Sequence, residues 1–196
     1  MASDDSRSTS PSLIDRVKRR DAVAWSRLAR IYSPLIYRWA RQCGMQSTDA
    51  ADAVQEVFLA VSKNVSRFDH DGATATFRGW LWTITRNHVR LFHRKRKGRE
   101  QAAGGTDANI ALQQYSEILE QAGEPVGFDS RRSLVHRALE VVREDFNATT
   151  WQAFLRLALH GEAATDVAAD LGMTPAAVRQ AKYRVLCRLH DEVAQA

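Results

Sequence analysis

Residues 171–185 have the sequence LGMTPAAVRQAKYRV, which predicts a tight turn followed by a helix. Thr174 suits the capping position of that helix, and Pro175 suits its first turn. The apolar residues that follow share one face at about 100° per residue: Val178, Ala181, Val185 and Leu189. A shorter apolar pattern before Gly172 predicts a preceding helix. This arrangement is typical of a helix-turn-helix.

The polar face of the second predicted helix has the chemistry of a duplex-DNA contact. It carries Arg179, Gln180, Tyr183 and Arg184. Arg and Gln can bond base edges, and Tyr and Arg can hold phosphates. A solvated face in a small bundle would have similar residues, but the glycine in the turn together with this polar stripe favours DNA binding.

A second basic segment, residues 77–97, is also predicted to be helical. Its expected buried face consists of Phe77, Leu81, Ile84, His88 and Leu91. Its expected outer face consists of Trp82, Arg86, Val89 and His93, with Trp80 assigned to the core. Between Arg86 and Arg99 there are seven basic residues in fourteen and no acid. Exposed aromatics beside arginines suit single-stranded nucleic acid, although a charge run of this kind can also be a solvated helix end.

The helix predicted over residues 49–65 carries a different surface. Its buried stripe is predicted to be Val54, Val57, Phe58, Val61 and Val65. The opposite face carries Asp52, Gln55, Glu56 and Leu59. An exposed leucine among carboxylates suits a protein partner, and a scattered surface leucine explains the pattern equally well.

The rest of the chain predicts an all-α fold of two small helical domains. No segment alternates with period two, and Ser33-Pro34 predicts a break between two helices. From Glu100 to Asp129 there are six acids and no Lys or Arg. We therefore expect a disordered tail over 1–12, a helical domain over 13–98, a flexible acidic linker over 99–132 and the helix-turn-helix domain over 133–196.

Composition excludes several classes of protein. The chain has 196 residues, a formal net charge of +5 and a pI of about 9.6, so an anionic partner is consistent with it. Cys43 and Cys187 have no zinc or disulfide spacing and are expected to be buried free thiols in a reducing cytoplasm. No secretory signal, membrane span, metal-ligand spacing, nucleotide-binding glycine loop or catalytic constellation is found. We expect a cytoplasmic protein that is not an enzyme and needs no cofactor or metal.

Two stretches, DAADAVQEVFL at 49–59 and FRGWLWTITRN at 77–87, resemble region two of bacterial extracytoplasmic-function sigma factors. The C-terminal helix-turn-helix is similar to their region four. The resemblance implies a subunit that binds core RNA polymerase, recognises the promoter minus-thirty-five and minus-ten elements and helps to open the DNA. One acid usual in the family is replaced by Ala51.

The resemblance also implies roles for particular residues. The polymerase-binding face, which grips the beta-prime coiled coil, is Asp52, Gln55, Glu56 and Leu59; the beta subunit is a further contact. The minus-ten DNA contacts, duplex and single-stranded, are Trp82, Arg86, Asn87, Arg90, Arg94, Lys95, Arg96 and Lys97, with Asn87 holding a flipped base. The minus-thirty-five contacts are Thr174, Arg179, Gln180, Tyr183 and Arg184.

Three readings remain open at this point, and the first is a sigma factor of this family. In the second reading, a stand-alone helix-turn-helix regulator would bind duplex DNA and use its N-terminal half for dimerisation or sensing. It would not need Trp82, Asn87 or the acidic linker. A small helical enzyme is the third reading, and it lacks a visible site. The resemblance to sigma factors leaves open an anti-sigma factor as a further partner.

Overall fold

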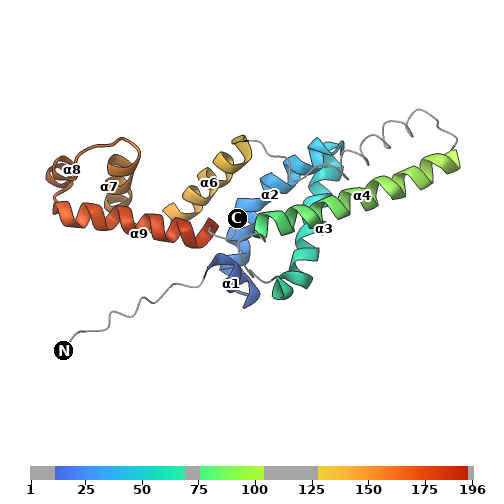
Figure 1. The fold of residues 1–196 in the computed structure, drawn as a ribbon, viewed down its shortest axis with the longest axis horizontal. Helices are drawn as coiled ribbons and strands as arrows, with labels where there is room; N and C mark the ends of the chain where they lie inside the picture. Colours follow the sequence, from blue (N-terminus) through green and yellow to red (C-terminus); the bar gives the residue numbers. More distant parts are fainter. Residues whose placement is uncertain (1–11, 69–75, 104–127, 194–196) are drawn as a thin grey trace. The chain divides into compact units, whose positions relative to one another are not determined.

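The computed structural model describes residues 12–68, 76–103 and 128–193, with side chains given for 12–68, 76–96 and 132–193. These residues form helices and no strand, which confirms the predicted all-α class (Figure 1). The helices are α1 Leu13–Lys18, α2 Ala22–Gln42, α3 Ser47–Asn64, α4 Phe77–Ala103, α6 Phe128–Arg143, α7 Ala148–Ala158, α8 Ala164–Leu171 and α9 Pro175–Val193, with a 3-10 turn at Val65–Arg67.

The chain divides into two compact units. One contains Ser26–Leu134, and the other contains Val135–Ala194 together with Met1–Trp25. Within the second unit, α1 contacts α9. This grouping differs from the expected 13–98 domain, whose bounds stay a prediction. The expected tail over 1–11 and most of the expected linker, residues 104–127, lie outside the described residues.

Both ends of the expected linker are helical in the structure. α4 continues to Ala103, and α6 begins at Phe128. The change in charge pattern predicted that the first helical region ends near residue 98. A change in charge does not end a helix when the residues that follow, such as Gln101, Ala102 and Ala103, have good helix propensity.

α2 runs without a break through Pro34, so the predicted start of a new helix there is wrong. A proline inside a helix removes one backbone hydrogen bond and costs about 3 kcal/mol relative to alanine. The apolar stripe of α2 is buried on both sides of this position, from Leu28 to Ala40. Burial of a single side chain of this size contributes about 1.5–3 kcal/mol, so the packing of the whole stripe outweighs the loss at Pro34.

α4 packs on α2 through aromatic rings. The Trp82 ring meets Trp39 of α2 edge-on, with centroids 5.3 Å apart, and the Phe77 ring meets Tyr32 at 5.2 Å. Trp39 is 0% exposed and Trp82 is 5% exposed. Trp82 therefore belongs to the core, and its prediction as an outward-facing residue is wrong.

The buried face of α4 agrees with the predicted one at Phe77 and Leu81 and departs from it further along the helix. The buried residues are Phe77, Arg78, Leu81, Trp82, Thr85 and Val89. Leu91, expected inside, is 41% exposed, while Val89, expected outside, is 0% exposed. The burial follows steps of four residues, which drift around the helix by about 40° per step. Packing against Trp39 and Tyr32 selects that face.

The helix-turn-helix in the C-terminal unit has its own core. Ala153 of α7, Val167 and Ala168 of α8, and Val178 and Ala181 of α9 form one buried cluster. α8 ends at Gly172, which adopts the left-handed conformation with φ 62° that glycine accommodates without strain. The Thr174 hydroxyl accepts the Ala177 N–H at 3.1 Å, so Thr174 caps α9 as predicted.

Replacing the buried Trp82 should therefore lower the stability of the fold. We expect Trp82→Ala to reduce the free energy of unfolding by about 3–5 kcal/mol, because it leaves a cavity against Trp39. Chemical denaturation of the full chain measures this. Gln55→Ala, a change at an exposed position, should stay within about 0.5 kcal/mol. Equal stabilities for the two variants would contradict the buried placement of Trp82.

Candidate nucleic-acid and partner interfaces

α3 presents the predicted polar face intact. Asp52, Gln55, Glu56 and Leu59 are all exposed, and Leu59 is 52% exposed. The opposite side of the helix is anchored by Ala50, Ala53, Val57 and Val61, which are 0% exposed. Val54 and Phe58, predicted to be buried, are half-buried. The structure thus brings the four candidate partner contacts onto one accessible surface.

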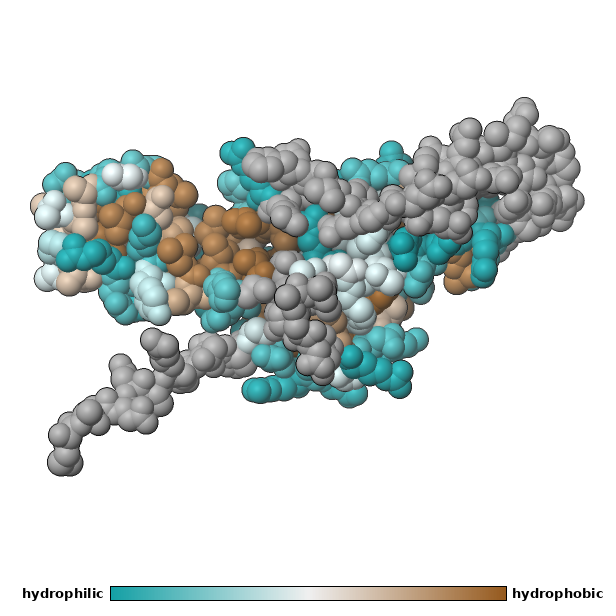
Figure 2. Space-filling model, in the orientation of Figure 1, coloured by the Kyte–Doolittle hydropathy of each residue, from teal (hydrophilic) through white to brown (hydrophobic). Residues whose placement is uncertain are grey.

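α4 presents a surface that is partly different from the predicted one. Asn87, Arg94, Lys95 and Arg96 are exposed, and Arg90 is half-buried. Arg86 is half-buried, and its Nε is enclosed without a hydrogen-bond partner among the described residues. The side chain of Lys97 lies outside the described ones. On the face in view in Figure 2, the described part of α4 is mainly hydrophilic.

The accessible aromatic at the start of α4 is Trp80 instead of Trp82. Trp80 is half-buried and lies against Phe68 and Phe77, with ring centroids 5.2 and 5.6 Å away. The two tryptophans are two positions apart and so about 200° apart around the helix. Trp82 packs on Trp39, whereas Trp80 packs beside two buried rings and stays partly accessible. The predicted exposure of Trp82 is therefore wrong, and the predicted core placement of Trp80 holds in part.

The pKa of His88 depends on charged groups of both α3 and α4. Burial of this half-buried ring lowers its pKa, and the positive charge of Lys95 lowers it further, while Glu56 of α3 acts in the opposite direction. The ring is therefore held neutral near pH 7. His93 of α4 also connects to α2, because its Nε2 lies 2.9 Å from the carbonyl oxygen of Cys43.

α9 exposes the predicted reading face. Arg179, Gln180, Tyr183 and Arg184 are exposed, with Tyr183 at 64%, and Thr174 is exposed at the cap. Val178, Ala181 and Val185 on the other side are 0% exposed. The structure therefore brings all the predicted duplex contacts together at the first three turns of one helix.

Ion pairs join neighbouring elements of the C-terminal unit. The Arg156 guanidinium of α7 donates to Glu162 in the following turn and to Asp170 of α8, with N–O distances of 2.5 and 2.7 Å. The hydrogen bond from Arg156 holds the pKa of the Glu162 carboxyl below its usual value. Arg188 of α9 pairs with Asp145 at 2.8 Å. These contacts connect α7 with α8 and α9 with the turn after α6, and α9 carries the predicted reading face.

The two cysteines differ in environment. Burial raises the pKa of the Cys43 thiol to about 11, so it stays protonated. Cys187 is exposed, and its predicted burial is wrong because its position on α9 lies outside the apolar stripe. Among the described residues, no group of three or more His, Cys, Asp or Glu is placed to hold a metal ion. No helix in the same part of the chain is long and apolar enough to cross a membrane.

Comparison with known proteins supports the resemblance noted in the sequence. Residues 28–99 match the family model of sigma-70 region 2. The chain is 25% identical over 188 residues to the ECF RNA polymerase sigma factor BldN of Streptomyces coelicolor, covering 94% of this chain and 66% of that protein. It is 26% identical over 175 residues to the ECF RNA polymerase sigma factor SigE of Mycolicibacterium smegmatis, covering 88% of this chain and 62% of that protein.

A third relative matches over a shorter span. The RNA polymerase sigma factor NccH of Alcaligenes xylosoxydans xylosoxydans is 31% identical over 107 residues, which is 53% of this chain and 56% of that protein. The matched region-two segment contains α3 and most of α4, the helices that carry two of the three candidate surfaces. The chain thus contains a segment of the sigma-70 region 2 family, and the two relatives matched over most of its length are named ECF RNA polymerase sigma factors.

Proposed function

We propose that this chain is a promoter-recognising subunit of RNA polymerase, which binds the core enzyme, reads the minus-thirty-five and minus-ten elements and assists DNA opening. The observation that carries the proposal is the exposed face of α3 within the segment that matches sigma-70 region 2. The function is that of a non-enzymatic factor acting on a cytoplasmic polymerase. An anti-sigma factor is a further proposed partner, since the α3 face and its exposed leucine suit a competing protein as well as polymerase.

Core binding is assigned to Asp52, Gln55, Glu56 and Leu59. Leu59 is the apolar centre of this face, and carboxylates flank it. Interfaces of this kind concentrate binding energy on a few central residues. The partner surface we assign is the beta-prime coiled coil, whose cationic side chains would complement Asp52 and Glu56, and the beta subunit is a second contact.

The α3 face can be tested with two charge changes. Leu59→Arg and Glu56→Lys should each weaken core polymerase binding about tenfold or more, because each places a positive charge at the centre of an acidic contact. Titration of labelled polymerase with the full chain measures this. Val23→Arg adds the same charge at an apolar residue that is 59% exposed and should bind normally. Normal binding by both α3 variants would refute this assignment and favour a stand-alone DNA-binding regulator.

Duplex reading is assigned to the exposed face of α9. A recognition helix places its N-terminal residues at base edges in the major groove. Arg179 and Gln180 lie in the first turns after the Thr174 cap, whereas Arg184 lies further along the helix. We therefore assign base contacts to Arg179 and Gln180, and phosphate contacts to Tyr183 and Arg184.

This division predicts two different mutant behaviours. Arg179→Ala should lose about 1–3 kcal/mol on duplexes that carry the preferred minus-thirty-five element and less on scrambled duplexes. Arg184→Ala should weaken binding to all duplexes alike and reduce the salt dependence. Fluorescence anisotropy across a salt series separates the two outcomes. Wild-type binding by both variants would mean that α9 is not the reading helix.

Strand capture is assigned to the outer face of α4. Asn87 is exposed and has an amide that can bond the edge of an extruded base. Trp80 offers the partly accessible ring that we first assigned to Trp82. Arg90 and the exposed cations Arg94, Lys95 and Arg96 lie further along the same helix, and Arg86 and Lys97 complete the proposed phosphate-binding set.

Variants of Asn87 and Trp80 should affect opening in different ways. Both Asn87→Ala and Trp80→Ala should reduce permanganate reactivity of the melted region on duplex promoter, while minus-thirty-five binding stays normal. A pre-melted promoter should restore more activity to Trp80→Ala, since loss of stacking costs about 1–3 kcal/mol and the base-specific contact remains. Gln152→Ala, an exposed amide change in α7, serves as the control. Full reactivity in both variants on duplex DNA would place strand capture elsewhere.

A further inference from the structure

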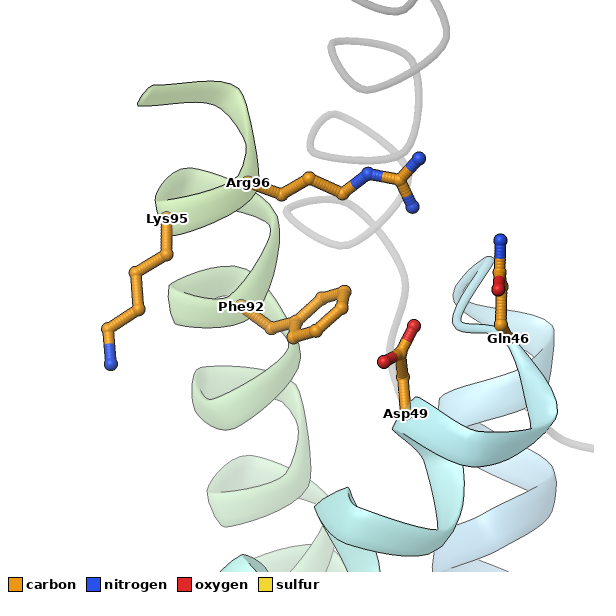
Figure 3. Close-up of a pocket in the computed structure, with 5 residues that line it drawn as sticks. All are labelled: Gln46, Asp49, Phe92, Lys95 and Arg96. Carbon is orange, nitrogen blue, oxygen red and sulfur yellow. The ribbon is translucent and has the colours of Figure 1, made fainter. Parts of the chain in front are cut away.

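A pocket lies between the start of α3 and the distal part of α4. Its volume is about 390 Å³, and it is lined by Gln46, Asp49, Phe92, Lys95 and Arg96. In Figure 3 the Phe92 ring and the Arg96 side chain extend from α4 toward α3, and Asp49 and Gln46 stand on the facing side. Lys95 points away from them. The roles proposed above use none of Gln46, Asp49 or Phe92.

The lining combines an aromatic ring, a cation and a carboxylate. Phe92 is a half-buried aromatic ring, Arg96 is an exposed cation and Asp49 is a half-buried carboxylate. A base can stack on an aromatic ring, and a guanidinium can donate hydrogen bonds to a phosphate. The carboxylate repels a simple anion such as inorganic phosphate and attracts a ligand with N–H donors. Together these groups suit a nucleotide, and the volume falls in the range of small-ligand sites.

The carboxylate also selects among the bases. It is acceptor-only, with two oxygens side by side. Guanine is the base whose pairing edge presents two adjacent donors, the ring N1–H and the N2 amino group. No other base has two adjacent donors on that edge: adenine has one donor beside one acceptor, cytosine one donor beside two acceptors, and thymine one donor between two acceptors. The Gln46 side chain makes no capping hydrogen bond at the start of α3, and it supplies a further amide at the pocket.

We infer that this pocket binds a guanine nucleotide, with the base stacked on Phe92, its pairing edge on Asp49 and its phosphate at Arg96. The inference deepens the proposed function and rests on it for the source of the nucleotide, which is a DNA strand exposed when the promoter opens. Single-stranded bases are accessible to this kind of edge recognition, whereas paired bases are not.

Asp49 has a structural explanation that the experiment must separate from binding. It lies in the first turn of α3, where an acid is favourable because of the helix dipole. Loss of that contact would lower stability, but it would not change a preference for one base over another. The decisive readout is therefore base identity.

The test measures binding of fluorescein-labelled oligothymidylate strands to the full chain by anisotropy. The strands carry a single central dG, dA or dC, or thymidine alone. The dG strand should bind about tenfold tighter than the others, which corresponds to one bidentate contact. Asp49→Asn should abolish that preference and leave the other strands within about twofold. Asp49→Ser, which retains a group suited to a helix start, should do the same.

Two further variants and a control complete the design. Phe92→Leu should weaken the dG strand while keeping an apolar side chain in the wall of the pocket. Arg96→Gln should weaken every strand alike and reduce the salt dependence. Asp166→Asn removes an exposed carboxylate from α8 and should leave the dG preference unchanged. Thermal unfolding of each variant verifies that it is folded.

Competition with guanosine monophosphate distinguishes the two sources of the nucleotide. Displacement of the dG strand by the free nucleotide would assign the pocket to a free guanine nucleotide and overturn the assignment to DNA. Retention of the dG preference in the presence of the free nucleotide would assign the pocket to a DNA strand. Equal binding of all four strands together with no displacement would overturn the inference, as would a dG preference that survives in Asp49→Asn and Asp49→Ser. Core polymerase binding by Asp49→Asn should be normal, so failure of the pocket is separable from failure of the proposed function.

Discussion

The edge-on contact between Trp39 and Trp82 determines which residues α4 offers to a ligand. The two rings lie 5.3 Å apart between α2 and α4, and neither indole N–H has a hydrogen-bond partner in the described part of the chain. Apolar packing therefore fixes the contact, and packing is sensitive to rotation of either helix. Once Trp82 faces α2, Trp80 and Asn87 must face elsewhere. The strand-binding surface is thus a consequence of the core.

α4 combines two roles, because one part of it packs in the core and another part presents side chains to solvent. Its first half supplies core residues and a partly accessible tryptophan, and further along it presents the exposed cations Arg94, Lys95 and Arg96. Because the helix is continuous, the packing of its first half also fixes the direction in which each residue of its second half faces. Asn87 and Arg94 therefore hold a defined orientation although neither is buried. His88 and His93 add contacts from α4 toward α3 and α2.

The C-terminal unit also depends on apolar packing, and ion pairs add contacts between its elements. One cluster of alanine and valine joins α7, α8 and α9, and a second cluster around Val142, Phe154 and Val185 joins α6, α7 and α9. Arg156 ties α7 to the next turn and to α8, and Arg188 ties α9 to the turn after α6. Gly172 and Thr174 then define where α9 begins. The reading face depends on that starting point, because a shift of one residue rotates it by about 100°.

Local sequence alone determined the features that depend on neighbouring residues. The helix-turn-helix turn, the Thr174 cap, the exposed face of α3 and the polar face of α9 follow from spacing, capping chemistry and apolar periodicity within one segment. The rotation of α4 and the unbroken passage of α2 through Pro34 were decided by tertiary packing. In each case two arrangements satisfy the local pattern, and only a side chain from another helix, such as Trp39 against Trp82, makes one of them lower in free energy.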